Sequence, residues 1–119
     1  MRVIIVGGAG QRGEAVSYLL SREPSIADLV IADKRPDIAE RLANRLGDHV
    51  RSTAIDLHDA TALDRLLDGA DLMVNATGPY RETLLPCLRA AIGQAVNYCD
   101  FSDDYVAMEN ALALGSVLN

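Results

Sequence analysis

Val3-Ile4-Ile5-Val6-Gly7-Gly8-Ala9-Gly10-Gln11-Arg12-Gly13 opens the chain and sets its architecture. The four residues from Val3 to Val6 are branched, apolar and uninterrupted, which is typical of a strand covered on both faces. An amphipathic helical pattern begins at Gln11, directly after the glycines. A pyrophosphate group needs backbone N–H donors, room for close approach and a helix N-terminus that points at it. A glycine-rich turn between a buried strand and a helix offers all three.

Each glycine of the G-x-G-x-x-G pattern has its own role in this interpretation. Gly8 permits the sharp turn off the strand, Gly10 lets phosphates come near because it has no Cβ, and Gly13 lets the helix pack against the strand. Gly7 adds an overlapping frame, Gly7-x-x-Gly10-x-x-Gly13, that a related class of nucleotide-binding folds uses. The residues predicted to hold phosphate are Gly8, Ala9, Gly10, Gln11, Arg12 and Gly13.

The rest of the chain alternates short apolar runs with helical patterns. Further strands are predicted at residues 29–32, 50–55, 72–74 and 95–98, and helices at 11–22, 36–46, from Asp59 or Thr61 to Gly69, from Thr83 onward, and from Ser102 to about Leu114. This alternation indicates a parallel sheet with right-handed crossovers. The third run is more polar, which suits a sheet edge. We therefore predict a Rossmann-type, doubly wound α/β fold with strand order 3-2-1-4-5.

Three details of the predicted elements are specific enough to check. The first helix is expected to turn Ala15, Val16, Leu19 and Leu20 toward the sheet. The helix that Thr83 would cap places Pro86 in its first turn, where proline is tolerated. Residues 116–119 resemble the approach to a sixth strand or a frayed tail.

Asp33 identifies the class of ligand. It ends the second strand twenty residues after Gly13, where a carboxylate accepts hydrogen bonds from the adenosine ribose hydroxyls. The expected cofactor is therefore NAD or NADP. The carboxylate gives a slight preference for NAD because it repels a 2′-phosphate, but Lys34 and Arg35 follow at once and could neutralise that phosphate.

Ligands of open α/β sheets lie outside the carboxyl ends of the strands, so two further strand ends are of interest. Asp56 follows the third strand, where it lies near the adenine or begins a turn. Ala76, Thr77 and Gly78 follow the fourth strand, and such small residues let the cofactor pass toward its nicotinamide end. With Asp33 and Lys34, these four residues complete the predicted cofactor-binding set.

No catalytic residue is assigned from the sequence. Tyr80, Cys99 and Asp100 lie nearest the expected nicotinamide, where Asp100 could orient a substrate amine or a water, or the acidic run that it begins could cap the last helix. Tyr105 is followed four residues on by Glu109, so the Tyr-x-x-x-Lys pair of short-chain dehydrogenases is missing there. His49 and His58 are expected on the surface, far from the nicotinamide.

Composition excludes several classes of partner. The chain has 119 residues and a net charge of −6, which fits one domain and argues against nucleic acid or an anionic membrane surface. Its two cysteines, Cys87 and Cys99, fit no metal motif and are expected to be reduced thiols in a cytoplasmic protein. Nothing resembles a targeting segment or a membrane span.

On these residues the chain resembles the N-terminal domain of the saccharopine dehydrogenase-like family. The matching stretches are residues 3–13, Ala32-Asp33, Ile55-Asp56, Asn75-Ala76-Thr77-Gly78-Pro79-Tyr80 and Asn97-Tyr98-Cys99-Asp100-Phe101-Ser102-Asp103-Asp104. The resemblance implies an NAD- or NADP-dependent oxidoreductase that acts on C–N bonds of amino-acid-derived substrates. It also implies a second domain that binds substrate and often dimerises, so a homodimer is an expected assembly of the full protein. Residues 1–119 would then be an isolated cofactor domain, inactive alone.

A second function class stays open from the sequence alone. A nucleotide-sensing regulatory module would bind the same dinucleotide without catalysing a reaction. The segments 75–80 and 97–104 favour the oxidoreductase.

Overall fold

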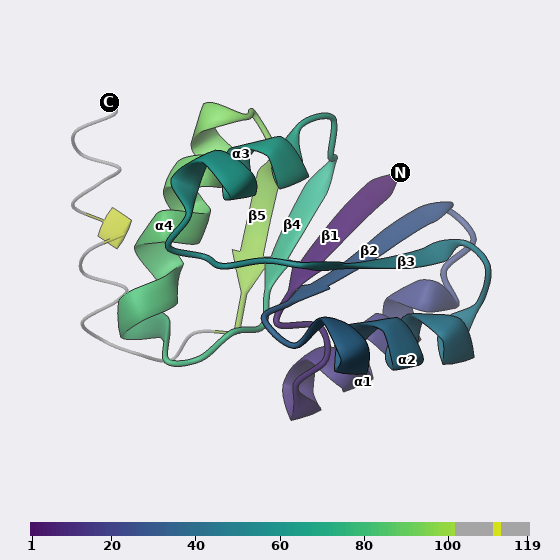
Figure 1. The fold of residues 1–119 in the computed structure, drawn as a ribbon. Helices are drawn as coiled ribbons and strands as arrows, with labels where there is room; N and C mark the ends of the chain where they lie inside the picture. The colour runs from purple at the N-terminus through teal and green to yellow at the C-terminus, as the bar shows by residue number, and fades with distance from the viewer. Residues whose placement is uncertain (102–110, 113–119) are drawn as a thin grey trace.

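A five-stranded parallel sheet forms the centre of the structure, a computed structural model that describes residues 1–101, 111 and 112 (Figure 1). Its strands are β1 (Arg2–Val6), β2 (Asp28–Asp33), β3 (Val50–Ala54), β4 (Leu72–Asn75) and β5 (Asn97–Asp100). They lie side by side in the order β3-β2-β1-β4-β5, which confirms the predicted topology and places the polar β3 at an edge.

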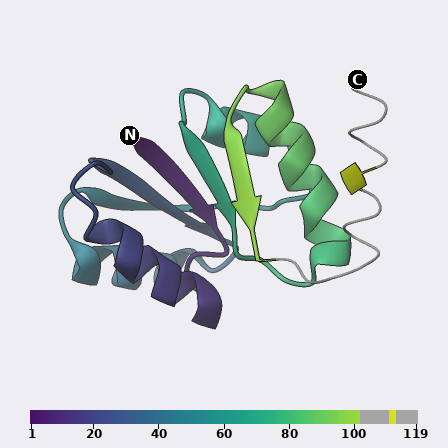
Figure 2. The ribbon, with the colours of Figure 1, turned by 180° about the vertical axis from the view of Figure 1, so that it is seen from behind.

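Two pairs of helices cover the sheet. The helices are α1 (Gln11–Ser21), α2 (Pro36–Leu46), α3 (Ala60–Leu67) and α4 (Tyr80–Gly93). One face carries α1 and α2 and the other carries α3 and α4 (Figures 1 and 2). The connection therefore changes faces after β3, and the strand order reverses at β1, between β2 and β4. Ligands of such sheets bind at this switch point.

The central strand β1 supplies both halves of the core. Ile4 and Val6 pack toward α3 and α4, while Val3 and Ile5 pack toward α1 and α2, and all four are fully buried. Alternate side chains of a strand point to opposite faces, so a strand with two covered faces must be apolar throughout. This burial fixes the end of β1, and with it the position of the glycine turn.

The inward face of α1 differs from the prediction. Val16 and Leu20 pack on the core as expected, but Ala15 and Leu19 are exposed, Leu19 to 67%. Close packing of Gly13 against the turn rotates the helix so that Gly13 and Ser17, one turn apart, face the sheet. A periodicity based on large apolar residues misses this face because its innermost members are a glycine and a serine.

The start of α4 also differs from the prediction. The helix begins at Tyr80 with Pro79 as its N-cap residue, so Thr83 does not cap it and Pro86 lies inside the helix. The Thr83 hydroxyl instead donates to the Thr77 carbonyl oxygen at 2.7 Å.

The bounds of β3 and β5 differ from the prediction by one or two residues. β3 ends at Ala54 rather than at residue 55, and β5 runs from Asn97 to Asp100 rather than from residue 95 to 98. Ala95 has a φ of 57°, which makes it part of the turn before β5. The predicted last helix lies almost wholly outside the described residues, and the predicted sixth strand lies wholly outside them. Within the described part of the chain, no helix is long and apolar enough to cross a membrane.

Candidate functional site

A cleft of about 610 Å³ opens at the carboxyl ends of the strands. Its walls come from the glycine turn, the segments after β2, β3 and β4, and the first turn of α4. Seven of the residues predicted to bind cofactor line it: Gly10, Asp33, Lys34, Asp56, Ala76, Thr77 and Gly78. The fold therefore brings together strand ends that lie far apart in the sequence.

The glycine turn is built by contacts that exclude side chains. Gly7 has a φ of 74°, and a Cβ there would overlap the Thr77 hydroxyl. A Cβ on Gly13 would overlap the Gly7 carbonyl oxygen and lie 2.7 Å from Gly8 Cα. A Cβ on Gly10, by contrast, would meet only Gly7 O at 3.5 Å and an Arg35 nitrogen at 3.8 Å. Gly7 and Gly13 thus serve the fold, whereas Gly10 leaves open space toward the cleft.

The N-terminus of α1 is available to an anion. Gly10 is its N-cap residue, and no side chain in the described part of the chain caps the helix there. The first amides of a helix have no partner within it, so the N–H groups of Gln11, Arg12 and Gly13 carry the positive end of the helix dipole. The amides of Ala9 and Gly10 are already used, by Asp33 Oδ2 at 3.2 Å and by Gly7 O at 3.1 Å.

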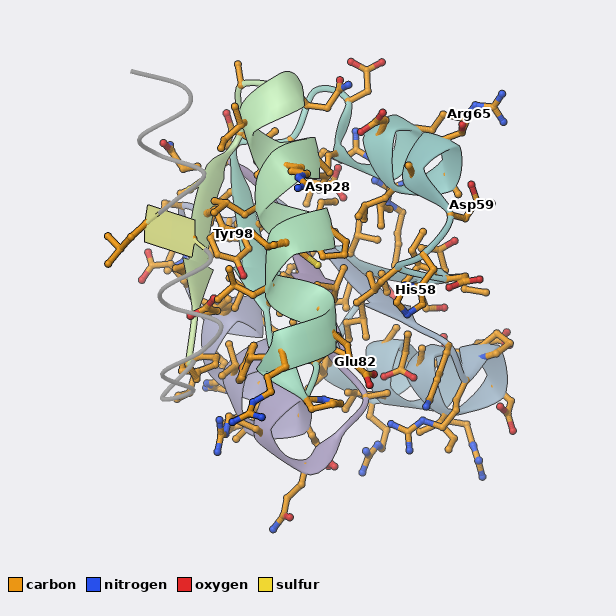
Figure 3. The ribbon with its side chains drawn as sticks, turned by 90° about the vertical axis from the view of Figure 1, so that its left-hand side faces the viewer. Asp28, His58, Asp59, Arg65, Glu82 and Tyr98 are labelled. Carbon is orange, nitrogen blue, oxygen red and sulfur yellow. The ribbon has the colours of Figure 1, made fainter. Side chains whose placement is uncertain are left out.

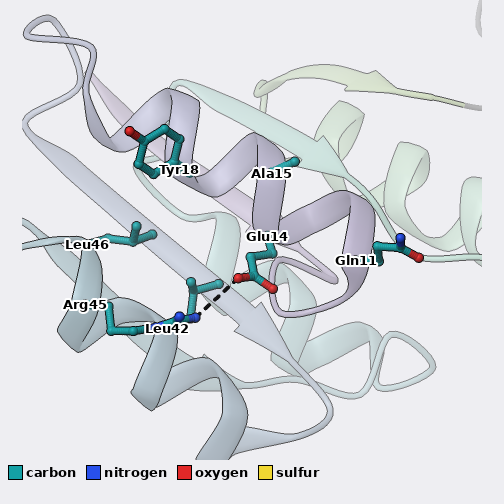
Figure 4. Close-up of a pocket in the computed structure, with 7 residues that line it drawn as sticks. All are labelled: Gln11, Glu14, Ala15, Tyr18, Leu42, Arg45 and Leu46. Atoms are coloured by element: carbon teal, nitrogen blue, oxygen red, sulfur yellow. Dashed lines mark hydrogen bonds and ion pairs between the residues drawn. The ribbon is translucent and has the colours of Figure 1, made fainter.

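Several residues of the predicted cofactor-binding set contribute to the cleft only through their main chain or lie outside it. Gly8 and Ala9 are buried behind the turn, and the side chains of Gln11 and Arg12 are exposed. Gln11 lines a separate hollow of about 490 Å³ between α1 and α2 (Figure 4). The ion pair between Glu14 and Arg45, 3.3 Å long, bridges that hollow.

Asp33 is buried and ion-paired at the end of β2. Its carboxylate accepts hydrogen bonds from Ala9 N and from the main chain and side chain of Arg35, with Arg35 N at 3.0 Å and Nε at 3.1 Å. Burial alone opposes ionisation, but the bonds and charge of Arg35, with the Ala9 amide, outweigh it and lower the pKa of Asp33. Arg35, absent from the predicted set, thus brings a cation to the end of β2.

The lowered pKa of Asp33 predicts a pH-dependent contribution to stability. A carboxyl whose pKa is lower folded than unfolded stabilises the fold above its unfolded value, near 3.8, and loses this effect as pH falls through the folded pKa. We expect Asp33→Asn to lower the free energy of unfolding at pH 7 and the gap from wild type to narrow below about pH 4. Urea denaturation at pH 3, 5 and 7 checks this; a gap independent of pH would contradict it.

The segment after β3 forms the far wall of the cleft. Asp56 accepts a hydrogen bond from the His58 amide at 2.9 Å, so it both begins a turn and lines the cleft. His58 is exposed, as expected, yet it also lines the cleft, opposite Glu82 of α4 (Figure 3). Sequence reasoning missed Leu57, His58 and Glu82 as lining residues, although two of them directly follow a predicted strand end.

The segment after β4 presents an unused polar atom. Thr77 lines the cleft, and its hydroxyl oxygen is buried with no hydrogen-bond partner among the described residues. The Ala76 amide donates to Val6 O at 2.9 Å and the Thr77 amide to Asn75 Oδ1 at 3.0 Å. A buried hydroxyl without a partner is costly, so it indicates a ligand that completes its bonding.

The residues nearest the expected nicotinamide are held by other contacts. Tyr80 is buried and its hydroxyl donates to Asn75 O at 3.1 Å. Cys99 lies within β5 and is exposed, yet partial desolvation followed by the charge of Asp100 raises its pKa. Burial raises the pKa of Cys87 to about 12. Neither thiol is therefore an activated nucleophile at neutral pH, and the described residues hold no cluster of His, Cys, Asp or Glu suited to a metal.

Fold and cleft together define a dinucleotide-binding domain of the Rossmann type. The open Gly10 position, the uncapped N-terminus of α1 and the unpartnered Thr77 hydroxyl all fit such a ligand. The family model for the saccharopine dehydrogenase NADP binding domain matches residues 3–116, and the chain belongs to this family. It is thus a nucleotide-binding domain.

Solved structures share this fold. Apo saccharopine dehydrogenase (L-Glu forming) from Saccharomyces cerevisiae is 22% identical with a TM-score of 0.78, over 92% of this chain and 23% of that one. NADPH-dependent quinone oxidoreductase QOR2 from Escherichia coli, complexed with NADPH, is 21% identical with a TM-score of 0.71, over 93% and 44%. Triphenylmethane reductase from Citrobacter sp., complexed with NADP(H), is 20% identical with a TM-score of 0.66, over 89% and 41%. A search of curated proteins found no significant match.

Proposed function

We propose that residues 1–119 are the NADP(H)-binding domain of an oxidoreductase that transfers hydride to or from an amino-acid-derived substrate. The nicotinamide ring supplies the hydride chemistry when the cofactor is bound. This domain binds and orients the cofactor, and a further domain holds the substrate. The cleft supports the proposal best, because it joins an anion-binding helix terminus to an acidic residue and an unpartnered hydroxyl at successive strand ends.

In this proposal, four groups of residues bind the cofactor. The first amides of α1 hold the pyrophosphate through the helix N-terminus. Asp33 holds the adenosine ribose, Arg35 holds its 2′-phosphate, and Asp56 with His58 borders the adenine. Thr77 and the Gly78 amide contact the cofactor between pyrophosphate and nicotinamide.

The slight preference for NAD expected from Asp33 is not supported, and we propose NADP instead. The Asp33 carboxylate is already paired with Arg35, whose nitrogen lies only 3.8 Å from where a Gly10 Cβ would be. A guanidinium in this position can bind a 2′-phosphate by charge-assisted hydrogen bonds. The neighbouring Lys34 adds a second positive charge on the cleft. The family description, which names NADP, points the same way.

Titration of the chain with NADPH and NADH tests the proposed function. A ligand at 100 times its Kd adds about 2.7 kcal/mol to the free energy of unfolding, so the melting temperature should rise by roughly 10 °C. Calorimetry should show tighter binding of NADPH. The proposal fails if neither cofactor changes the melting temperature or releases heat.

Arg35→Ala should weaken NADPH binding selectively. Hydrogen bonds to a charged group contribute about 1.5–3 kcal/mol, so we expect a loss of roughly 10- to 100-fold for NADPH and little change for NADH. Arg41→Ala removes the same charge from an exposed position on α2, paired only weakly with Asp37, and serves as the matched control. Equal losses of both cofactors in Arg35→Ala would contradict the assignment of Arg35 to the 2′-phosphate.

A further inference from the structure

Asn75 ties the cofactor-facing segment after β4 to the neighbouring strand β5. Its side chain is fully buried at the end of β4. Oδ1 accepts a hydrogen bond from the Thr77 amide at 3.0 Å, and Nδ2 donates to the Tyr98 hydroxyl at 3.1 Å. The Tyr98 hydroxyl in turn donates to Asp100 Oδ2 at 2.7 Å. Tyr98 comes from β5 (Figure 3), so one line of contacts joins Asp100 to the segment that borders the cleft.

This line of hydrogen bonds has only one direction. The Thr77 amide can only donate, which requires the carbonyl oxygen of the Asn75 side chain to face it. The NH₂ group of Asn75 must then donate to the Tyr98 oxygen, and the Tyr98 proton must point to the Asp100 carboxylate. Burial, with the adjacent Asp100, raises the pKa of Tyr98, so its hydroxyl remains a donor at neutral pH.

The segment held in this way has few donors left. Its amides at Ala76 and Thr77 are consumed by Val6 and Asn75, and the Thr77 carbonyl is taken by Thr83. The donors of this segment that have no partner among the described residues are the Thr77 hydroxyl, which lies against Gly7, and the amide of Gly78. The position of these two donors therefore depends on the rotamer of Asn75, which is held by Tyr98 of β5 at 3.1 Å and, through a longer bond of 3.5 Å, by Thr83 of α4.

We propose that Asn75, Tyr98 and Asp100 are positioning residues, a directed hydrogen-bond chain that fixes the Thr77 hydroxyl and the Gly78 amide for the cofactor. The inference rests on the proposed function for the identity of the ligand. It goes beyond that function because Tyr98 and Asp100 do not line the cleft and act only through Asn75. It also assigns a role to the end of β5.

Tyr98→Phe is the decisive variant because it removes one hydroxyl and alters no residue of the cleft. Nδ2 would then keep only its longer hydrogen bond to Thr83 Oγ1, at 3.5 Å, so the Asn75 side chain would be held less firmly. We expect the Thr77 amide to exchange its hydrogen up to about tenfold faster, and NADPH to bind up to about tenfold more weakly, since one net hydrogen bond is worth about 0.5–1.5 kcal/mol. Amide exchange by NMR and calorimetry measure the two effects. Tyr18→Phe, which removes an exposed hydroxyl on α1, is the control.

A double-mutant cycle distinguishes a chain from separate contacts. Asn75→Leu should weaken NADPH binding more than Tyr98→Phe, and the double variant should lose no more than Asn75→Leu alone. If the affinity losses of the two single variants multiply in the double variant, the proposed hydrogen-bond chain is contradicted. It is also contradicted by a Tyr98→Phe variant with unchanged Thr77 exchange, or one in which all slowly exchanging amides speed up equally. The exchange measurement needs no cofactor, so it tests the inference even if NADPH does not bind.

Discussion

Replacement of Gly13 by alanine is expected to destabilise the fold more than any other single methyl group added to the glycine turn. The new Cβ would overlap the Gly7 carbonyl oxygen and crowd Gly8 Cα, so main-chain atoms would have to move. Overpacking usually costs about 1–3 kcal/mol, and a clash between backbones belongs at or above the upper end. The domain's stability is of the order of 5–15 kcal/mol, so a large share would be lost.

Urea denaturation followed by circular dichroism measures this loss, and the melting temperature should fall by roughly 10 °C. Gly93→Ala is the matched control, because no atom lies within 4 Å of a Cβ at that helical position. Alanine is the better helix former, so the control should be unchanged or slightly stabilised. Gly13→Ala with wild-type stability would mean that α1 does not pack on the turn as closely as described.

Gly10→Val should have the opposite effect to Gly13→Ala: the variant should fold normally but should not bind the cofactor. Gly10 has a φ of −75° and ψ of 174°, which valine adopts readily, and its Cβ would meet only ordinary contacts in the protein. The added side chain would instead occupy the space where phosphates approach the first amides of α1. Loss of two hydrogen bonds to a charged group predicts an affinity lower by about 100-fold or more.

Calorimetry with NADPH, together with a melting curve of the unliganded variant, checks both halves of this prediction. Gly10→Ala should fall between wild type and Gly10→Val, and Gly93→Val should bind as the wild type does. If Gly10→Val bound NADPH with undiminished affinity, the glycine turn would not be part of the cofactor-binding site. A variant that fails to fold would instead show that Gly10 serves the fold as Gly13 does. The two glycines, three residues apart in one motif, are thus expected to separate folding from binding.

Most of the site's location follows from the strand ends, but its chemistry does not. The residues after β1, β2, β3 and β4 were predicted to border the ligand because parallel strands end at the same edge of the sheet, and seven of them do. Arg35 was considered, with Lys34, as a charge that could neutralise a 2′-phosphate, but it was not placed in the predicted cofactor-binding set. Its ion pair with that carboxylate depends on how the chain turns into α2, which residue types alone do not specify.

The amino-acid sequence by itself determined the strand order, the glycine turn and the apolar character of the central strand β1. These features are encoded locally, in hydrophobic period and in residues such as glycine whose backbone freedom is unique. Tertiary structure alone decided that Gly13 and Ser17 face the sheet, that α4 starts at Tyr80, and that Asn75, Tyr98 and Asp100 meet. The meeting of Asn75, Tyr98 and Asp100 depends on the register of β5 beside β4, which places Tyr98 beside Met73 and Asp100 beside Asn75. Hydrogen bonds between strands distant in sequence leave no periodic signal in either strand.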